Sequence, residues 1–189
     1  MPELSNAEFM LLQILQQEGS LSGYGINNLV EERHYRPWAD VGMTSIYVSL
    51  KKLQQKGLVD SSVDTQKTGK GPLPKLFTLL ANGLTALRQE TESTLASPES
   101  RGARLSLALS ASNVLAPKKL LACLQQRQQG LQWILKTVRE ERYEAKGGAQ
   151  LPTPAQWLFR HSFALLETEI QFAHQLIDEL QTESRNGKN

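Results

Sequence analysis

Apolar residues recur every three to four positions in several segments of the first hundred residues, and this period predicts helices. One helix is predicted to begin at a capping-box sequence that starts at Ser5, and a second to follow Ser22 and end before Pro37. Thr44 is a suitable N-cap for a third helix, which ends at Gly57.

Two short runs with strand-like composition, residues 58–63 and 76–79, come after the third helix. A basic segment rich in glycine and proline, residues 67–72, joins them and indicates a hairpin. A further helix is predicted from about Leu80 to Leu95. Three helices, a hairpin and another helix is the order of a winged helix-turn-helix domain.

Small and polar residues over 96–102 mark a domain boundary, so we expect one domain over 1–96 and a second, helical domain over 103–189. Apolar residues alternate with others over residues 104–109, and this short pattern does not distinguish a helix from a strand. A long helix is predicted to begin at Pro117, since proline suits the first helical turn.

The last predicted helix has the most regular apolar pattern in the chain. Its first stripe repeats at intervals of four and three, and comprises Phe159, Phe163, Leu166, Ile170, Ala173, Ile177 and Leu180. A second stripe lies beside it, and comprises Leu158, Leu165, Phe172 and Leu176. One stripe can pack on the preceding helix, and the other then needs a second subunit. We assign the dimer interface to Phe159, Phe163, Leu166, Ile170, Ile177 and Leu180.

The predicted fold class is therefore mainly α: a winged helix-turn-helix domain of three helices and a β-hairpin wing, followed by a dimerisation domain of two to three helices. The net charge of the 189 residues is only +2. The positive charge is local, however, because residues 44–77 contain 6 Lys and 2 Asp, whereas residues 1–43 contain 2 Arg and 6 acidic residues. A basic segment of this kind is typical of a nucleic-acid binder.

The sequence shows no signal peptide and no run of about 20 apolar residues, so we expect a cytoplasmic protein with no membrane partner. The single cysteine, Cys123, excludes an internal disulfide and is expected to pack as a small core residue.

The third helix presents a small, polar and cationic face opposite its apolar face, as a helix in the DNA major groove requires. Its lysines could instead be merely solvated, as on an ordinary surface helix, and Tyr47 could equally be a core residue or a phosphate contact. The helix residues that we assign to double-stranded DNA are Thr44, Ser45, Tyr47, Val48, Lys51 and Lys52. The wing adds Lys67, Lys70 and Lys75 as phosphate contacts.

Three motifs in this order resemble the PadR family of transcriptional regulators. Residues 21–26, Leu-Ser-Gly-Tyr-Gly-Ile, resemble the start of the family's second helix. Residues 45–59 are similar to its recognition helix, with an Ile-Tyr pair and a Gly-Leu-Val end, and residues 69–75 are similar to its Gly-rich wing. The family usually has a threonine that caps the next helix, where this chain has Leu80, so we expect that helix to start about 1 kcal/mol less favourably.

The resemblance implies a homodimer, formed through the last helices, that binds a pseudo-palindromic operator, with a repressor favoured. Some members bind flat aromatic effectors, which makes Trp38, just before the third helix, a tentative effector-binding residue. The alternative is a winged-helix adaptor that binds proteins and not DNA. The three histidines are dispersed, and no nucleophile, phosphate-loop or metal-ligand pattern is present, so we expect neither an enzyme nor a cofactor or metal.

Overall fold

The computed structural model describes residues 4–36, 43–65 and 73–186. The described chain forms two compact units. The first contains the described residues up to Thr94 together with Ser100–Leu115, and the second contains Leu95–Glu99 and the described residues from Ala116 onward. Among the described residues, no helix is both long enough and apolar enough to cross a membrane.

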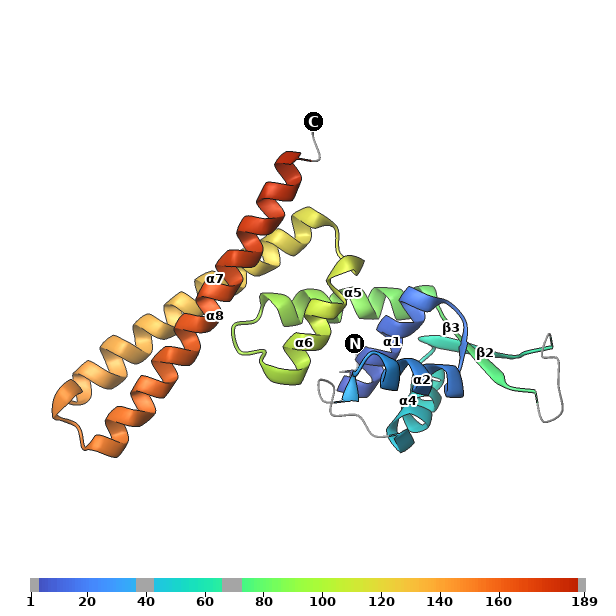
Figure 1. Cartoon of the computed structure of the whole chain (residues 1–189), viewed down its shortest axis with the longest axis horizontal. Coiled ribbons are helices and arrows are strands. Elements are labelled where there is room, and N and C mark those ends of the chain that lie inside the picture. Colours follow the sequence, from blue (N-terminus) through green and yellow to red (C-terminus); the bar gives the residue numbers. More distant parts are fainter. Residues whose placement is uncertain (1–3, 37–42, 66–72, 187–189) are drawn as a thin grey trace. The chain divides into compact units, whose positions relative to one another are not determined.

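The first unit is a winged helix-turn-helix domain, in which a β-hairpin extends from a group of helices (Figure 1). Its elements in chain order are α1 (Asn6–Glu18), β1 (Leu21–Ser22), α2 (Gly23–Glu32), α4 (Met43–Gln55), β2 (Val59–Val63), β3 (Lys75–Leu79), α5 (Ala81–Ala96), α6 (Gly102–Ser110) and the short 3-10 helix η1 (Ser112–Val114). The predicted order of three helices, hairpin and helix is confirmed.

The central element of this unit is α1. The predicted capping box is present: the Ser5 hydroxyl accepts from the Glu8 backbone N–H, and the Glu8 carboxylate accepts from the Ser5 backbone N–H at 2.8 Å. Every residue from Phe9 to Leu15 is buried, so the helix is enclosed on all sides rather than on one face. It contacts α4, α6 and β3.

The wing belongs to a three-stranded antiparallel sheet in the order β1-β3-β2. The two strands of the hairpin, β2 and β3, pair with Ser61 opposite Phe77, while Leu21 of β1 pairs with Phe77 from the other side. Strand β1 was not predicted, because two residues are too short to show a strand period. Its pairing anchors the wing to the segment that precedes α2.

A close backbone contact holds the start of α5 against the base of the wing. Leu80 donates its backbone N–H to the carbonyl oxygen of Leu58 at 3.0 Å, and its side chain offers no cap to α5. Gly83 lies one turn later, and a Cβ added there would be 2.1 Å from that same oxygen of Leu58. Only glycine allows this approach.

The segment 104–109, for which the sequence did not distinguish a helix from a strand, lies in the helix α6. This helix packs on α1, and Gln13, buried in α1, donates to the Ser110 hydroxyl at 2.6 Å. The predicted second domain began at residue 103, whereas the contacts of the chain group Ser100–Leu115 with the first unit.

The second unit is a helical hairpin in which α7 (Pro117–Thr137) and α8 (Thr153–Asn186) run antiparallel along one another (Figure 1). They are joined by a π-helical turn, η2 (Val138–Tyr143), and the 3-10 turns η3 (Glu144–Lys146) and η4 (Gly148–Gln150). Pro117 occupies the first turn of α7, as predicted. Gly130 inside α7 has a packing reason, since a Cβ there would be 2.8 Å from Cγ of Pro98.

We predict that Gly83→Ala destabilises the protein by at least about 2 kcal/mol, because the new methyl group collides with rigid backbone at Leu58. Gly25→Ala in α2 is the matched control. A Cβ at Gly25 meets nothing closer than 3.4 Å, so this change should stabilise by up to about 1 kcal/mol through helix propensity. Chemical denaturation measures both, and similar effects of the two changes would contradict the packing explanation.

Candidate nucleic-acid interface

The helix α4 has one face in the core and one face in solvent. Ile46, Leu50 and Leu53 are 0 to 1% exposed and pack within the first unit, where α4 contacts α1 and α2. These three residues recur at intervals of four and three, so they fix the rotation of the helix about its own axis. The residues between them are thereby directed outward.

The outward face carries Thr44, Val48, Lys51 and Gln55, all of them exposed. Their spacing of four, three and four places them on a single line along the helix. Val48 is 48% exposed although it is apolar, and a methyl-bearing side chain on a polar face suits contact with the methyl group of thymine. Three of the predicted DNA-binding residues therefore lie together, while Ser45 lies half-buried to one side.

Tyr47 lies on one flank of α4, against the first turn of α2. A Cβ added at Gly23 would be 2.6 Å from Cε1 of Tyr47, so the tyrosine ring rests on a backbone without a side chain. Tyr47 is nevertheless 51% exposed, so its ring packs while part of its surface stays open to solvent. Gly23 was missed as a structural partner of α4, since a glycine in sequence gives no hint of what approaches it.

Tyr24, in the first turn of α2, is 70% exposed. The buried residues of α2 are Gly23, Ile26, Asn27 and Val30. Ser22 caps α2 by accepting the backbone N–H of Gly25 at 3.0 Å. An exposed aromatic side chain thus lies in the first turn of α2, the helix that precedes α4 in the helix-turn-helix.

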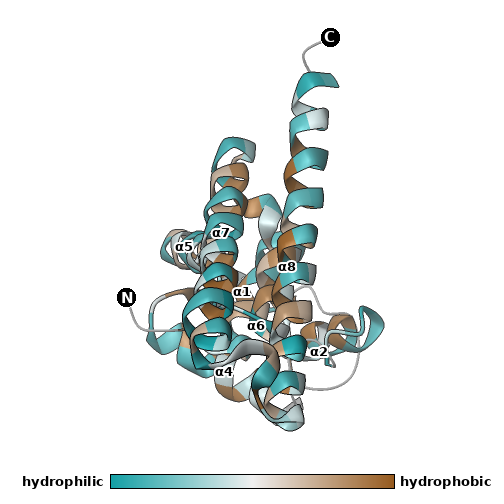
Figure 2. Cartoon of the chain, turned by 90° about the vertical axis from the view of Figure 1, so that its left-hand side faces the viewer, coloured by the Kyte–Doolittle hydropathy of each residue, from teal (hydrophilic) through white to brown (hydrophobic). Residues whose placement is uncertain are grey.

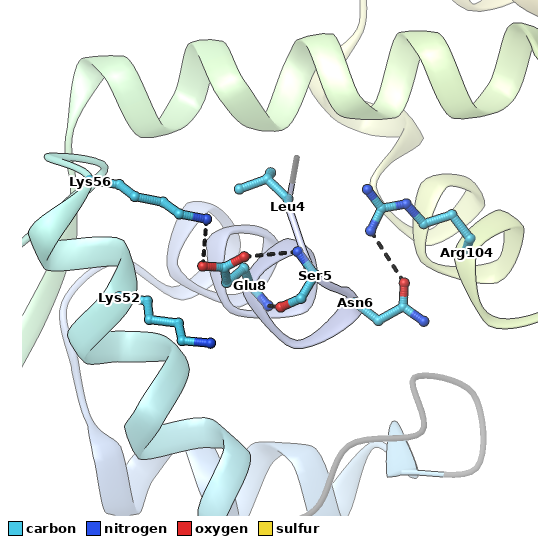
Figure 3. A pocket seen from close by; sticks show the side chains of 7 residues that line it. All are labelled: Leu4, Ser5, Asn6, Glu8, Lys52, Lys56 and Arg104. Carbon is cyan, nitrogen blue, oxygen red and sulfur yellow. Dashed lines mark hydrogen bonds and ion pairs between the residues drawn. The ribbon is translucent and has the colours of Figure 1, made fainter. Parts of the chain in front are cut away.

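Lys52 lies on the other flank of α4 and points toward the N-terminal end of α1 (Figure 3). One turn further, Lys56 binds Glu8 of α1 at 2.7 Å. Both lysines line a pocket of about 750 Å³, together with residues of α1 and Arg104 of α6. Lys51 and Lys52 are adjacent in sequence, but successive side chains point in different directions around a helix. Lys51 therefore lies on the outward face, and Lys52 lies on the flank beside the pocket.

The ion pair with Lys56 changes the acidity of Glu8. Burial raises the pKa of this carboxyl, but the hydrogen bonds from Lys56 and from the Ser5 backbone outweigh burial and hold the pKa below its ordinary value. Glu8 therefore stays ionised at neutral pH. Its carboxylate accepts the Ser5 backbone N–H at the start of α1 and also binds Lys56 just after α4, so it connects the two helices.

Of the predicted wing contacts, Lys75 is exposed on β3, opposite Val63 of β2. Lys67 and Lys70 lie outside the described residues, and so does Trp38, the tentative effector-binding residue. The hypothesis of an aromatic effector at Trp38 stays a prediction.

The first apolar stripe of α8 faces α7 of the same chain. Leu166 and Ile177 are 3 and 5% exposed, and Phe159 and Phe163 pack around Tyr143 with ring centroids 5.2 and 5.6 Å from it. Ile170 and Leu180 are half-buried. The stripe assigned to the dimer interface is thus largely used within the hairpin. The second stripe is the one left in solvent.

The sequence of the first unit matches the model of a known family. The model of the PadR-like family of transcriptional regulators matches residues 11–89, from α1 through the wing into α5. The chain therefore carries a PadR-like domain. This domain contains the whole of α4 and the hairpin, which is where the residues assigned to DNA lie.

The chain is also similar to solved structures of PadR and PadR-like proteins. Bacillus subtilis PadR in complex with operator DNA is 17% identical, over 92% of this chain and 98% of that chain, with a TM-score of 0.42. A PadR-like transcriptional regulator from Bacillus cereus is 14% identical, over 94 and 99% of the two chains, with a TM-score of 0.39. Bacillus subtilis PadR in complex with p-coumaric acid is 17% identical, over 93 and 99%, with a TM-score of 0.39. No curated protein sequence matches the chain.

We predict that Glu8→Gln lowers the free energy of unfolding by about 1–3 kcal/mol at pH 7, because it leaves Lys56 without its carboxylate. Since the folded pKa of Glu8 is lowered, its contribution is present above the ordinary pKa of 4.5 and is lost as pH falls below that value. The difference between parent and variant should therefore shrink in acid. Glu18→Gln, which affects a more exposed ion pair with Arg33, should change stability by less than about 1 kcal/mol. A difference at Glu8 that does not depend on pH would contradict this account.

Proposed function

We propose that this protein is a DNA-binding transcriptional regulator that acts as a homodimer on a pseudo-palindromic operator, and that it represses by occupying the DNA. The observation that carries the proposal is the outward face of α4, where Thr44, Val48 and Lys51 are exposed together. The buried face of the same helix is fully used in the core, so the outward face is free for a ligand.

The chemistry of this face matches the major groove of DNA. Threonine and valine are small and allow the helix backbone to approach the base edges, while lysine binds guanine acceptors or phosphate. Lys75 on the hairpin adds a second cation at a distance from the helix, suited to a neighbouring phosphate. Repression needs only that the bound dimer exclude other proteins from the promoter.

Dimerisation is supported by apolar residues of the second unit that the chain itself leaves uncovered. Leu158, Leu165 and Phe172 are 70, 46 and 41% exposed, and their spacing of seven residues places them on one line along α8. Figure 2 shows apolar residues recurring along the length of α8 between polar ones. Two copies of this line can cover one another, and a two-fold dimer would then fix the distance between two α4 helices.

The first test is the salt dependence of DNA binding. If each subunit neutralises three or four phosphates, log K should fall with log salt at a slope of roughly −5 to −7. Electrophoretic mobility shifts with operator fragments, selected from genomic DNA by the purified protein, provide the measurement. A slope near zero would favour the protein-binding adaptor instead.

Single substitutions separate base contact from phosphate contact. Lys51→Ala should change which operator bases are preferred, whereas Lys75→Ala should weaken binding to all sequences by a similar factor. Because it removes one phosphate contact from each subunit, Lys75→Ala should also reduce the magnitude of the salt slope by about 2. Lys118→Ala on α7 removes the same charge from the second unit and should leave affinity nearly unchanged. Equal effects of all three changes would show that only net charge matters.

Disrupting the second stripe should separate the subunits. Leu165→Glu places a charge on a side chain that is 46% exposed in the single chain, so each chain should stay folded while the dimer dissociates. Gln171→Glu introduces the same charge elsewhere on α8 and serves as the control. Sedimentation should show monomers for Leu165→Glu and dimers for Gln171→Glu. Operator affinity should be lost in Leu165→Glu alone. A variant that stays dimeric would place the interface elsewhere.

A further inference from the structure

The pocket beside α4 contains more positive than negative charge. Its lining comprises Leu4, Ser5, Asn6, Glu8, Lys52, Lys56 and Arg104, which supplies three cations and one carboxylate. The volume of about 750 Å³ is large enough for a small organic molecule and is open to solvent. Figure 3 shows Lys52 reaching in from α4, Lys56 from the turn that follows α4, and Arg104 from the opposite side, with the start of α1 between them.

The single carboxylate of the lining is already engaged. One oxygen of Glu8 accepts from Lys56 at 2.7 Å, and the other accepts from the Ser5 backbone at 2.8 Å. Lys52 has no ion-pair partner among the residues that the structure describes, although it faces this concave site. A cation in a concavity without a counter-charge attracts an anion from solution.

Arg104 is held in place by its neighbours. Its guanidinium pairs with Glu90, donates to the Asn6 side chain at 3.2 Å, and lies 5.0 Å from the centroid of the Phe9 ring. An anchored guanidinium keeps free N–H groups in a fixed orientation, so an anion loses little entropy in meeting it. Arg104 therefore supplies a preorganised wall and Lys52 a mobile cation that can close onto a ligand.

We propose that this pocket binds a small anion bearing a carboxylate or a phosphate, and that this ligand competes with DNA for Lys52. The competition rests on the function proposed above, whereas the binding of the anion does not. Lys52 lies between the outward face of α4 and the pocket. When its ammonium group turns into the pocket toward the anion, it is withdrawn from the DNA, and operator affinity falls by linkage.

The site is first tested on the free full-length protein, with inorganic phosphate and benzoate as separate probes and sodium chloride at equal ionic strength as the reference. Either probe should raise the melting temperature, because it binds the folded state. In amide NMR spectra, the shifts should concentrate at residues 4–8, 52–56 and 104. The two probes distinguish a phosphate site from a carboxylate site. Failure of both to bind would overturn the proposal.

Two neighbouring lysines provide matched variants. Lys52→Met removes the charge and keeps an unbranched side chain, and it should weaken binding of the effective probe by about tenfold. Lys51→Met makes the same change on the outward face and should leave binding of the probe unchanged. If both variants bind the probe equally weakly, the probe is attracted by net charge only. If Lys52→Met binds the probe as well as the parent does, the anion binds elsewhere. Either result would overturn the proposed site.

Competition is tested on the operator complex. The effective probe should weaken operator binding by the parent roughly three- to tenfold beyond the effect of ionic strength, and should have little such effect on Lys52→Met. If the probe binds the pocket and leaves operator affinity unchanged, the competition is overturned. If the protein binds no DNA at all, the proposed function fails while the anion site stands on the first measurements. If Lys52→Met weakens DNA binding but no probe binds the free protein, the pocket serves a phosphate of DNA and the proposal is wrong.

Discussion

The enclosure of α1 is the constraint on which the first unit depends. Every side chain from Phe9 to Leu15 is buried, so α4, α6 and β3 must pack around this one helix. Most of these residues are apolar, and burying each large apolar side chain stabilises the fold by about 1.5–3 kcal/mol. The exception is Gln13, which is 0% exposed and donates to Ser110 of α6 and to the Tyr35 hydroxyl. The core thus fixes the position of the surrounding elements as well as their stability.

The rotation of α4 follows from this core. Because Ile46, Leu50 and Leu53 must face α1 and α2, the remaining positions are divided into an outward line and two flanks. The contact of Tyr47 with Gly23 fixes one flank, and the ion pair of Lys56 with Glu8 fixes the other. The same packing that stabilises the domain therefore sets the orientation of the outward face of α4, which we propose contacts DNA, and forms the pocket that we propose binds an anion.

In the helical hairpin of the second unit, packing likewise determines which face of α8 is buried and which is exposed. Its buried stripe is satisfied within the chain by α7, and Arg127, 2% exposed, pairs with Glu169 at 2.7 Å across the two helices. A long helix with two adjacent apolar stripes still leaves one in solvent after one partner has been found. The second stripe is therefore the surface through which we propose that two copies of the chain associate.

The sequence by itself determined the order of the helices that flank the hairpin, the hairpin itself and the capping box at Ser5, because these depend on local period and short-range hydrogen bonds. It also identified Thr44, Val48 and Lys51 as a common face, since helical geometry alone places them together. The tertiary structure decided what depends on contacts between distant residues. Such contacts bring β1 to the wing, α6 to α1, Gly83 to the Leu58 carbonyl, and Lys52 to a pocket that it shares with Arg104. No period in the sequence encodes which surfaces meet, so these features became visible only in the folded chain.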